Sequence, residues 1–141
     1  MGDIFRKIDV CGLDVRGRKL RCSRVDALVD PGSTTTVISE KLATAIGGPY
    51  LEGMEATIEG RKVPVKLTGL TLDSPGCKIR ALTVSVSNEI VARAGRAPNG
   101  HLADVILGHD YLQRSYAQIA YGERTKDHSV RCRNGKKARR K

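Results

Sequence analysis

One carboxylate in this sequence stands where a buried strand is expected to end. Asp30 directly follows the apolar run of residues 27–29, Ala-Leu-Val, and precedes Pro31, Gly32 and Ser33. A carboxylate can accept and release a proton during a reaction. The backbone N–H of Gly32 can approach it, because glycine has no side chain in the way. Asp-Pro-Gly is also a good turn, so this tripeptide alone is compatible with a purely structural role.

A second apolar segment follows about 70 residues later. Asp104 precedes Val105, Ile106 and Leu107, and the segment ends at Gly108. Uninterrupted apolar residues are typical of strands that are buried on both faces. Neither segment is decisive alone. Their order and spacing together indicate a functional site rather than an isolated turn.

Length and composition predict one globular domain followed by a basic tail. The chain has 141 residues, of which 40% are hydrophobic and 28% charged, as is ordinary for a globular protein. Aromatic residues are scarce, so the core must consist mainly of Val, Leu, Ile and Ala. We expect the domain to span residues 1–122 and a disordered extension to span residues 123–141.

The positive charge is concentrated at the C-terminal end. The net charge is +10, and residues 131–141 contribute seven cations and no acid, which leaves about +3 for the remainder. Such a run is typical of a solvated extension. Contact between this tail and nucleic acid or another acidic surface stays open, since such binding needs little structure. Few aromatic side chains argue against single-strand nucleic-acid binding by the fold itself.

The sequence contains no signal for a membrane or for secretion. No stretch approaches the roughly 20 apolar residues of a membrane-spanning helix, and the N-terminus has an early acid and no apolar run after it. We therefore expect a cytoplasmic protein without membrane association.

Cysteine and histidine spacing predicts no metal site and no cofactor. Cys11, Cys22, Cys77 and Cys132 form no Cys-x-x-Cys pair, and the three histidines form no His-Glu-x-x-His pattern. In a reducing cytoplasm we expect these thiols to be small apolar fillers. A Cys11–Cys22 bridge across an N-terminal hairpin stays open for an exported protein.

Alternation of apolar and polar residues, with frequent turn residues, predicts a mostly β chain. One helix is expected at residues 40–46, with Ser39 as its N-cap and Gly47 at its C-terminal end, and a second at residues 109–114. Residues 93–101 look least ordered. The expected strands cover residues 5–10, 20–30, 36–38, 54–58, 63–67, 70–72, 77–86, 105–107 and 118–121.

This order of elements resembles the retropepsin-like aspartic proteases, a single-domain group that includes retroviral proteases and bacterial relatives. The resemblance spans residues 5–121. It is carried by residues 27–33, 37–38, the hairpin 54–67, and the segment 105–108 with the short helix after it. It implies a mostly β fold, a single-domain acid-protease β-barrel with one or two short helices.

The resemblance also implies an activity and a homodimer. In that family each chain contributes one Asp, and two chains pair about a two-fold axis to build one site; this chain has a single copy of the motif. Two carboxylates within about 3 Å cannot both ionise cheaply, so the two Asp30 side chains would share one proton. One would activate a water that attacks a peptide bond, and the other would hydrogen-bond the scissile carbonyl. The partners implied are a second copy and a peptide or protein substrate.

The same resemblance assigns roles to individual residues. Asp30 would be catalytic, with Pro31, Gly32 and Ser33 forming the active-site loop, in which the Ser33 hydroxyl would donate to the outer carboxylate oxygen. The hairpin tip would be a flap that closes over the substrate, formed by Glu59, Gly60 and Arg61. The strand behind the loop would comprise Ile106, Leu107 and Gly108.

Pro31 departs from the family pattern. The family has Thr or Ser at this place, with a hydroxyl that reaches across the dimer axis, whereas Pro has neither a hydroxyl nor an N–H. Loss of that reciprocal pair of hydrogen bonds would cost about 1–3 kcal/mol per dimer. The alternative function is therefore a non-catalytic module of this fold that binds peptide, or that binds nucleic acid through its basic tail.

Overall fold

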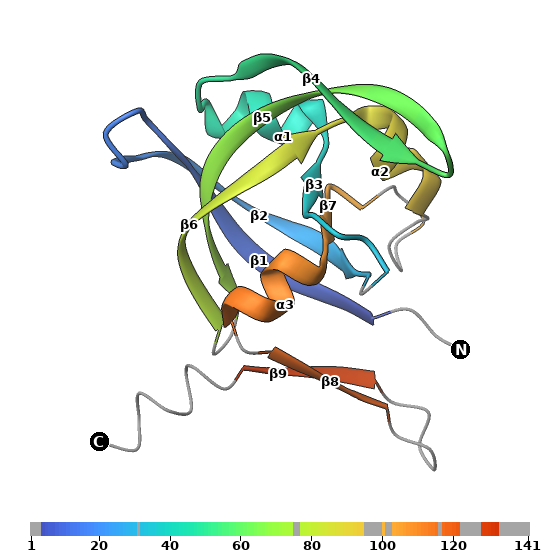
Figure 1. Cartoon of the computed structure of the whole chain (residues 1–141). Helices are drawn as coiled ribbons and strands as arrows, with labels where there is room; N and C mark the ends of the chain where they lie inside the picture. Colours follow the sequence, from blue (N-terminus) through green and yellow to red (C-terminus); the bar gives the residue numbers. More distant parts are fainter. Residues whose placement is uncertain are drawn as a thin grey trace.

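A computed structural model shows a β-barrel with short helices at its surface (Figure 1). It describes residues 4–30, 32–74, 77–94, 100, 103–115, 117–121 and 128–132. In chain order the elements are β1 (Ile4–Leu13), β2 (Lys19–Val29), β3 (Val37–Ile38), α1 (Glu40–Ile46), β4 (Leu51–Ile58), β5 (Arg61–Ser74), β6 (Cys77–Val86), α2 (Asn88–Ala94), β7 (Val105–Leu107), α3 (His109–Ser115), β8 (Ala117–Tyr121) and β9 (His128–Cys132).

Six strands close the barrel. The hydrogen-bonded order is β1-β2-β7-β3-β6-β5, and β1 also pairs with β5 to complete the ring. The short central strands β3 and β7 pair antiparallel with each other, while β2–β7 and β3–β6 are parallel. Among the strands that the structure describes, β4 pairs with β5 alone, so the β4–β5 hairpin projects from the ring. The predicted fold class, a mostly β retropepsin-like barrel with short helices, is confirmed.

Two apolar clusters support this arrangement. The larger lies inside the barrel and includes the fully buried ring of Tyr111 from α3. The smaller lies under the β4–β5 hairpin and joins α2 to the central strands; its buried members are Leu28, Val37, Val63, Val65, Ile90, Val91, Ala103 and Ile106. Burial of both faces explains why β7 is apolar throughout.

Helix α1 begins and ends where the sequence predicts. The Ser39 hydroxyl accepts a hydrogen bond from the Leu42 N–H at 3.1 Å, and Gly47 takes a left-handed conformation, φ 80°, that glycine adopts without strain. The apolar face of the helix, Leu42, Ala43 and Ile46, is buried.

The C-terminal part differs from the prediction. β8 does not join the barrel sheet but pairs with β9 in a separate two-stranded sheet. Residues 128–132, which were assigned from the sequence to the basic tail, form β9 and pair with β8. Residues 122–127 and 133–141 lie outside the described residues, and the domain boundary at 122 stays a prediction.

Cys11 and Cys22 form a disulfide bond, so the expectation that they are reduced apolar fillers is wrong. They lie directly opposite each other in the β1–β2 pair, with Cα atoms 4.0 Å apart. The side chains of Cys77 and Cys132 are outside the described part. Because cytoplasmic reductants oppose such bonds, the cytoplasmic location stays a prediction that the oxidation state of this pair tests.

Reduction of this disulfide is expected to lower the free energy of unfolding by about 2–3 kcal/mol, because the bond closes a short loop in the unfolded chain. Urea unfolding with and without a reductant measures the difference. The double variant Cys11→Ala/Cys22→Ala is the control and should not respond to the reductant. An equal response of the wild type and the double variant would contradict the assignment.

Candidate active site

Asp30 lies where β2 leaves the barrel. Its backbone N–H donates to the Leu107 carbonyl at 2.9 Å, which extends the β2–β7 pairing by one bond. Its carboxylate Oδ1 accepts from the Gly32 N–H at 3.0 Å, and its carbonyl accepts from the Ser33 N–H at 3.0 Å. The side chain is therefore held by the turn that follows it. The hydrogen bond from the Gly32 N–H agrees with the close approach to the carboxylate that is expected of a residue without a side chain. Pro31 lies outside the described residues.

The Ser33 hydroxyl has another partner than expected. Its Oγ donates to the Thr35 carbonyl at 2.8 Å, whereas the resemblance implied donation to the Asp30 carboxylate. A hydroxyl has one hydrogen to donate, so in this chain Ser33 shapes the loop.

Gly108 packs directly behind this loop. A Cβ atom at this position would lie 2.5 Å from the Thr35 oxygen and 2.8 Å from the Ser33 oxygen. The adjacent His109 N–H donates to the Ser33 carbonyl at 2.7 Å. Such close contact between backbones requires glycine, so the predicted supporting strand and the Asp30 loop are brought together here.

Thr36 and Asp110 fix the far end of the loop, and sequence reasoning missed this pair. Thr36 is fully buried; its N–H and its hydroxyl donate to the two Asp110 carboxylate oxygens at 3.0 and 2.8 Å. The same hydroxyl accepts from the Gly108 N–H at 3.1 Å. Asp110 was expected only to suit the N-terminal end of a helix, and nothing in the local sequence connects residues 74 positions apart.

Thr36→Val is expected to lower the free energy of unfolding by about 1–3 kcal/mol, because it leaves the buried N–H of Gly108 without its acceptor and removes one of the donors to Asp110 Oδ1. Thr36→Ser keeps the hydroxyl and serves as the matched control. Urea unfolding of both variants measures the difference. A larger loss in Thr36→Ser than in Thr36→Val would show that the methyl group, not the hydroxyl, matters at this position.

Asp30 opens onto a cavity of about 640 Å³. Gly32, Ser33 and Ile106 also line it, whereas Leu107 and Gly108 pack behind the loop. One wall is the β4–β5 hairpin, from which residues 54–59 contribute. The other wall includes two residues of α2, Ile90 and Arg93.

The predicted flap tip is a two-residue turn. Glu59 and Gly60 have φ angles of 50° and 79°, between the paired residues Ile58 and Arg61. Two successive positive φ angles are typical of a type I′ hairpin turn. Of the three predicted flap residues only Glu59 lines the cavity.

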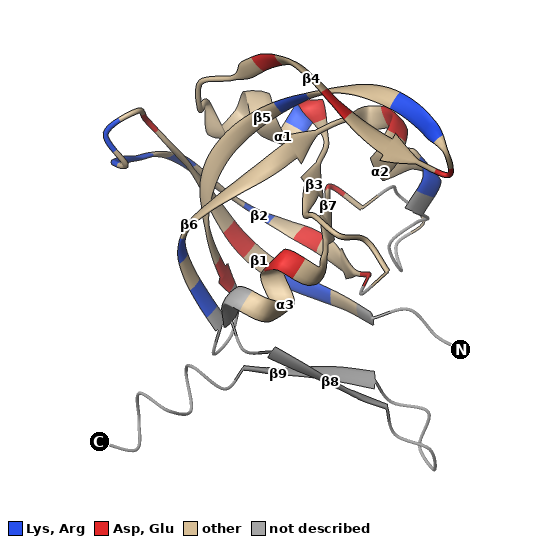
Figure 2. Ribbon diagram, in the orientation of Figure 1, with Lys and Arg blue, Asp and Glu red and all other residues tan. Residues whose placement is uncertain are grey.

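The hairpin tip forms ion pairs with α2. Arg61 Nη2 lies 2.7 Å from Glu89 Oε2, and Arg93 Nη1 lies 3.8 Å from Glu59 Oε2. Figure 2 shows residues of both charges on the tip and on the neighbouring helix. Sequence reasoning missed α2 and treated Arg93 as the start of a poorly ordered stretch. The available signal was Ser87, whose hydroxyl accepts from the Ile90 N–H as an N-cap does.

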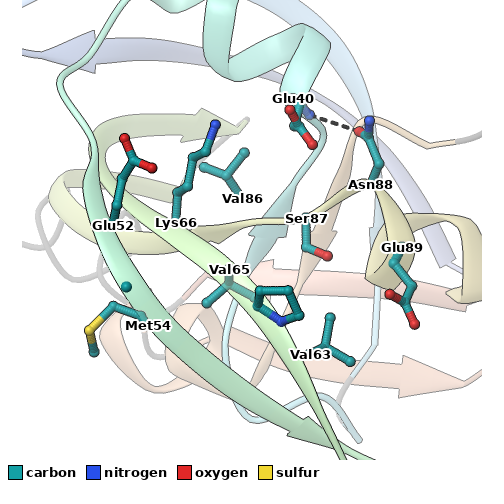
Figure 3. Close-up of a pocket in the computed structure, with 12 residues that line it drawn as sticks. Glu40, Glu52, Met54, Val63, Val65, Lys66, Val86, Ser87, Asn88 and Glu89 are labelled. Carbon is teal, nitrogen blue, oxygen red and sulfur yellow. Dashed lines mark hydrogen bonds between the residues drawn. The ribbon is translucent and has the colours of Figure 1, made fainter.

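A smaller cavity of about 340 Å³ adjoins the first (Figure 3). The two share Met54 and Val65 as lining residues. In the smaller one Asn88 Oδ1 accepts from the Glu40 N–H at 2.9 Å, which joins the starts of α1 and α2. Asp30 does not line it, so of the two cavities only the larger one contains the candidate catalytic carboxylate.

No group of three His, Cys, Asp or Glu residues in the described part of the chain could hold a metal ion. No described helix is long and apolar enough to cross a membrane.

Comparisons with solved structures identify the fold. EIAV protease complexed with the inhibitor HBY-793 matches with a TM-score of 0.55 at 18% identity, over 79% of this chain and 86% of that chain. A retropepsin-like aspartic protease from Rickettsia conorii matches with a TM-score of 0.54 at 12% identity, over 92% of this chain and 94% of that chain. The retroviral protease-like domain of Ddi1 from Leishmania major gives 0.50 at 14% identity, over 92% and 89%.

Sequence comparison gives the family. Among curated proteins none matched this sequence. The family model described as aspartyl protease matches residues 13–111, a span that runs from the end of β1 into α3 and contains both the Asp30 loop and the strand behind it. This chain therefore belongs to the aspartyl protease family, and its fold is that of the retropepsin-like members.

Proposed function

We propose that this protein is an aspartic endopeptidase whose active site forms when two copies pair and bring their Asp30 carboxylates together. The observation that carries the proposal is the Asp30 carboxylate itself. It is held by the Gly32 N–H at the mouth of a cavity large enough for a substrate segment.

The mechanism depends on one proton that the two Asp30 carboxylates of the dimer share. The ionised Asp30 accepts a proton from a water molecule, which attacks the carbonyl carbon of the scissile peptide bond. The protonated Asp30 of the second copy donates to the carbonyl oxygen and stabilises the tetrahedral intermediate. One of the two Asp30 carboxyl groups then donates its proton to the leaving nitrogen, and the carbon–nitrogen bond of the intermediate breaks. The Gly32 N–H holds the carboxylate in place throughout.

The cavity suits an extended peptide. Apolar side chains line its floor and walls, among them Val37, Ile90 and Ile106, and these can take hydrophobic side chains of a substrate. The β4–β5 hairpin contributes residues 54–59, and among the described strands β4 pairs only with β5. A strand with a free edge can bind an extended peptide by main-chain hydrogen bonds. We propose that the β4–β5 hairpin is the flap.

Dimer formation is needed because one chain provides one catalytic carboxylate. An isologous interface places identical residues face to face on a two-fold axis, as the mechanism requires. With Pro31 in place of a hydroxyl residue, the dimer must be held by other contacts, so we expect activity to depend on protein concentration. Contact of the basic tail with acidic surfaces rests on its charge alone.

Cleavage of a denatured-proteome peptide mixture, read by mass spectrometry from about pH 4 to 7, tests the proposal. Internal cuts are expected, at a rate that rises more steeply than linearly with protein concentration until dimers predominate. A mixture treated with Asp30→Asn supplies the background. Absence of cuts above this background at every pH and concentration would overturn the proposal and favour a peptide-binding module of the same fold.

A further inference from the structure

The α2 wall of the active-site cavity brings a positive charge to a mostly acidic and apolar lining. Among the described residues that line the cavity, Arg93 is the one cation, and the acids are Asp30, Glu55 and Glu59. Ile90 lies one turn earlier on the same helix and lines the same wall. A substrate side chain that reaches this wall therefore meets an apolar surface beside a guanidinium group.

Arg93 is held in position from its own helix. Its Nη2 donates to Glu89 Oε2 at 3.3 Å, four residues earlier. Glu89 is in turn fixed by Arg61 at 2.7 Å. This arrangement orients the guanidinium, but the Glu89 hydrogen bond uses few of its five N–H donors. The side chain lines the cavity and is 38% exposed.

The carboxylate that faces Arg93 from the flap is only loosely bound. Glu59 Oε2 lies 3.8 Å from Arg93 Nη1, too far for a hydrogen bond. The Glu59 side chain is 77% exposed and sits at the tip of the hairpin. A carboxylate that is so exposed and so distant contributes little to stability and can be replaced at low cost.

We propose that Arg93 binds an acidic side chain of the substrate, and that Glu59 occupies this place until the substrate arrives. The inference rests on the proposed peptidase function and names its substrate class: extended peptides with Asp or Glu at the position that reaches α2. A planar guanidinium matches the two oxygens of a carboxylate. When the hairpin lifts to admit a peptide, Glu59 leaves Arg93 and the donors become available.

Charge reversal at Arg93 gives the sharpest test. Peptides that the wild type cleaves are resynthesised with Glu, Gln or Lys at each position in turn, and kcat/KM is measured for each. The wild type should prefer Glu to Gln by about 3- to 10-fold at one position, as expected for a partly exposed charge pair. Arg93→Gln should remove this preference, and Arg93→Glu should replace it with a preference for Lys at the same position.

Two further variants separate a specific effect from a general one. Lys62→Gln removes a cation from the hairpin outside the cavity lining and should leave the Glu preference unchanged. Glu59→Gln removes the competing carboxylate and should preserve or increase the preference. Thermal unfolding checks that each variant folds. A Glu preference that survives in Arg93→Gln, or none in the wild type, would overturn the inference.

If the proposed peptidase function is wrong, no cleavage occurs at all, and the inference is then tested by peptide binding. If no variant cleaves any peptide, a set of synthetic extended peptides with Glu, Gln or Lys at each position in turn is used instead, and their binding to the unmodified chain and to Arg93→Glu is measured by fluorescence anisotropy. Tighter binding of Glu peptides to the wild type, reversed in Arg93→Glu, would support the inference for a binding module. Equal binding of all three peptides would refute it.

Discussion

Asp30→Asn is expected to lower kcat/KM for peptide cleavage by at least about 10³-fold, because an amide can neither take the proton from water nor return it. The loss should come without unfolding. The Asn side-chain oxygen has the same position and can still accept the Gly32 N–H bond that Asp30 Oδ1 accepts at 3.0 Å. Steady-state kinetics on a single peptide, together with a thermal unfolding curve for each protein, measure both quantities.

The variant separates chemistry from structure. An unfolding midpoint within a few degrees of the wild type, with cleavage lost, assigns the chemistry to this carboxylate. Cleavage by Asp30→Asn at more than about a tenth of the wild-type rate would show that another group, or a contaminating enzyme, is responsible.

Gly108→Ala is expected to lower the free energy of unfolding by about 3 kcal/mol or more. The new methyl group would lie 2.5 Å from the Thr35 oxygen and 2.8 Å from the Ser33 oxygen. Both are backbone atoms, so the loop itself must move. Its movement would also break the bond from the His109 N–H to the Ser33 carbonyl and displace Asp30, so that activity falls with stability.

Gly69→Ala is the matched control, because a Cβ atom there meets nothing within 4 Å. Its effect on unfolding should stay below about 0.5 kcal/mol. Urea unfolding compares the two variants directly. A small and equal effect in both would mean that the contact between Gly108 and the Asp30 loop is looser than the structure has it.

The parts of the site that lie close together in sequence could be predicted. The apolar end of β2, the turn around Gly32 and the bounds of α1 follow from local rules of burial and capping. Gly108 could be placed because an apolar strand that ends in glycine is itself a local pattern. The order of strands in the closed barrel could be predicted only from the resemblance to the family, because pairing between distant strands leaves little trace in a single sequence.

Contacts between distant residues could not be predicted. The hydroxyl of Thr36 and the carboxylate of Asp110 meet only because β3 and α3 both pack against β7. The Cys11–Cys22 bond required the exact register of β1 and β2. Helix α2 has seven residues, too few for a clear helical period. Because the helix was not predicted, the ion pairs of Arg93 and Glu89 could not be predicted either.

Titration of the wild type with Asp30→Asn tests the central proposal most directly. Total protein is held constant, subunits are allowed to exchange, and the cleavage rate is followed as the fraction of wild type falls. If the active site needs an Asp30 from each of two chains, the rate follows the square of that fraction, and an equal mixture keeps about one quarter of the full rate. A rate that falls in simple proportion, so that an equal mixture keeps about half, would mean that each chain acts alone and would contradict the proposal.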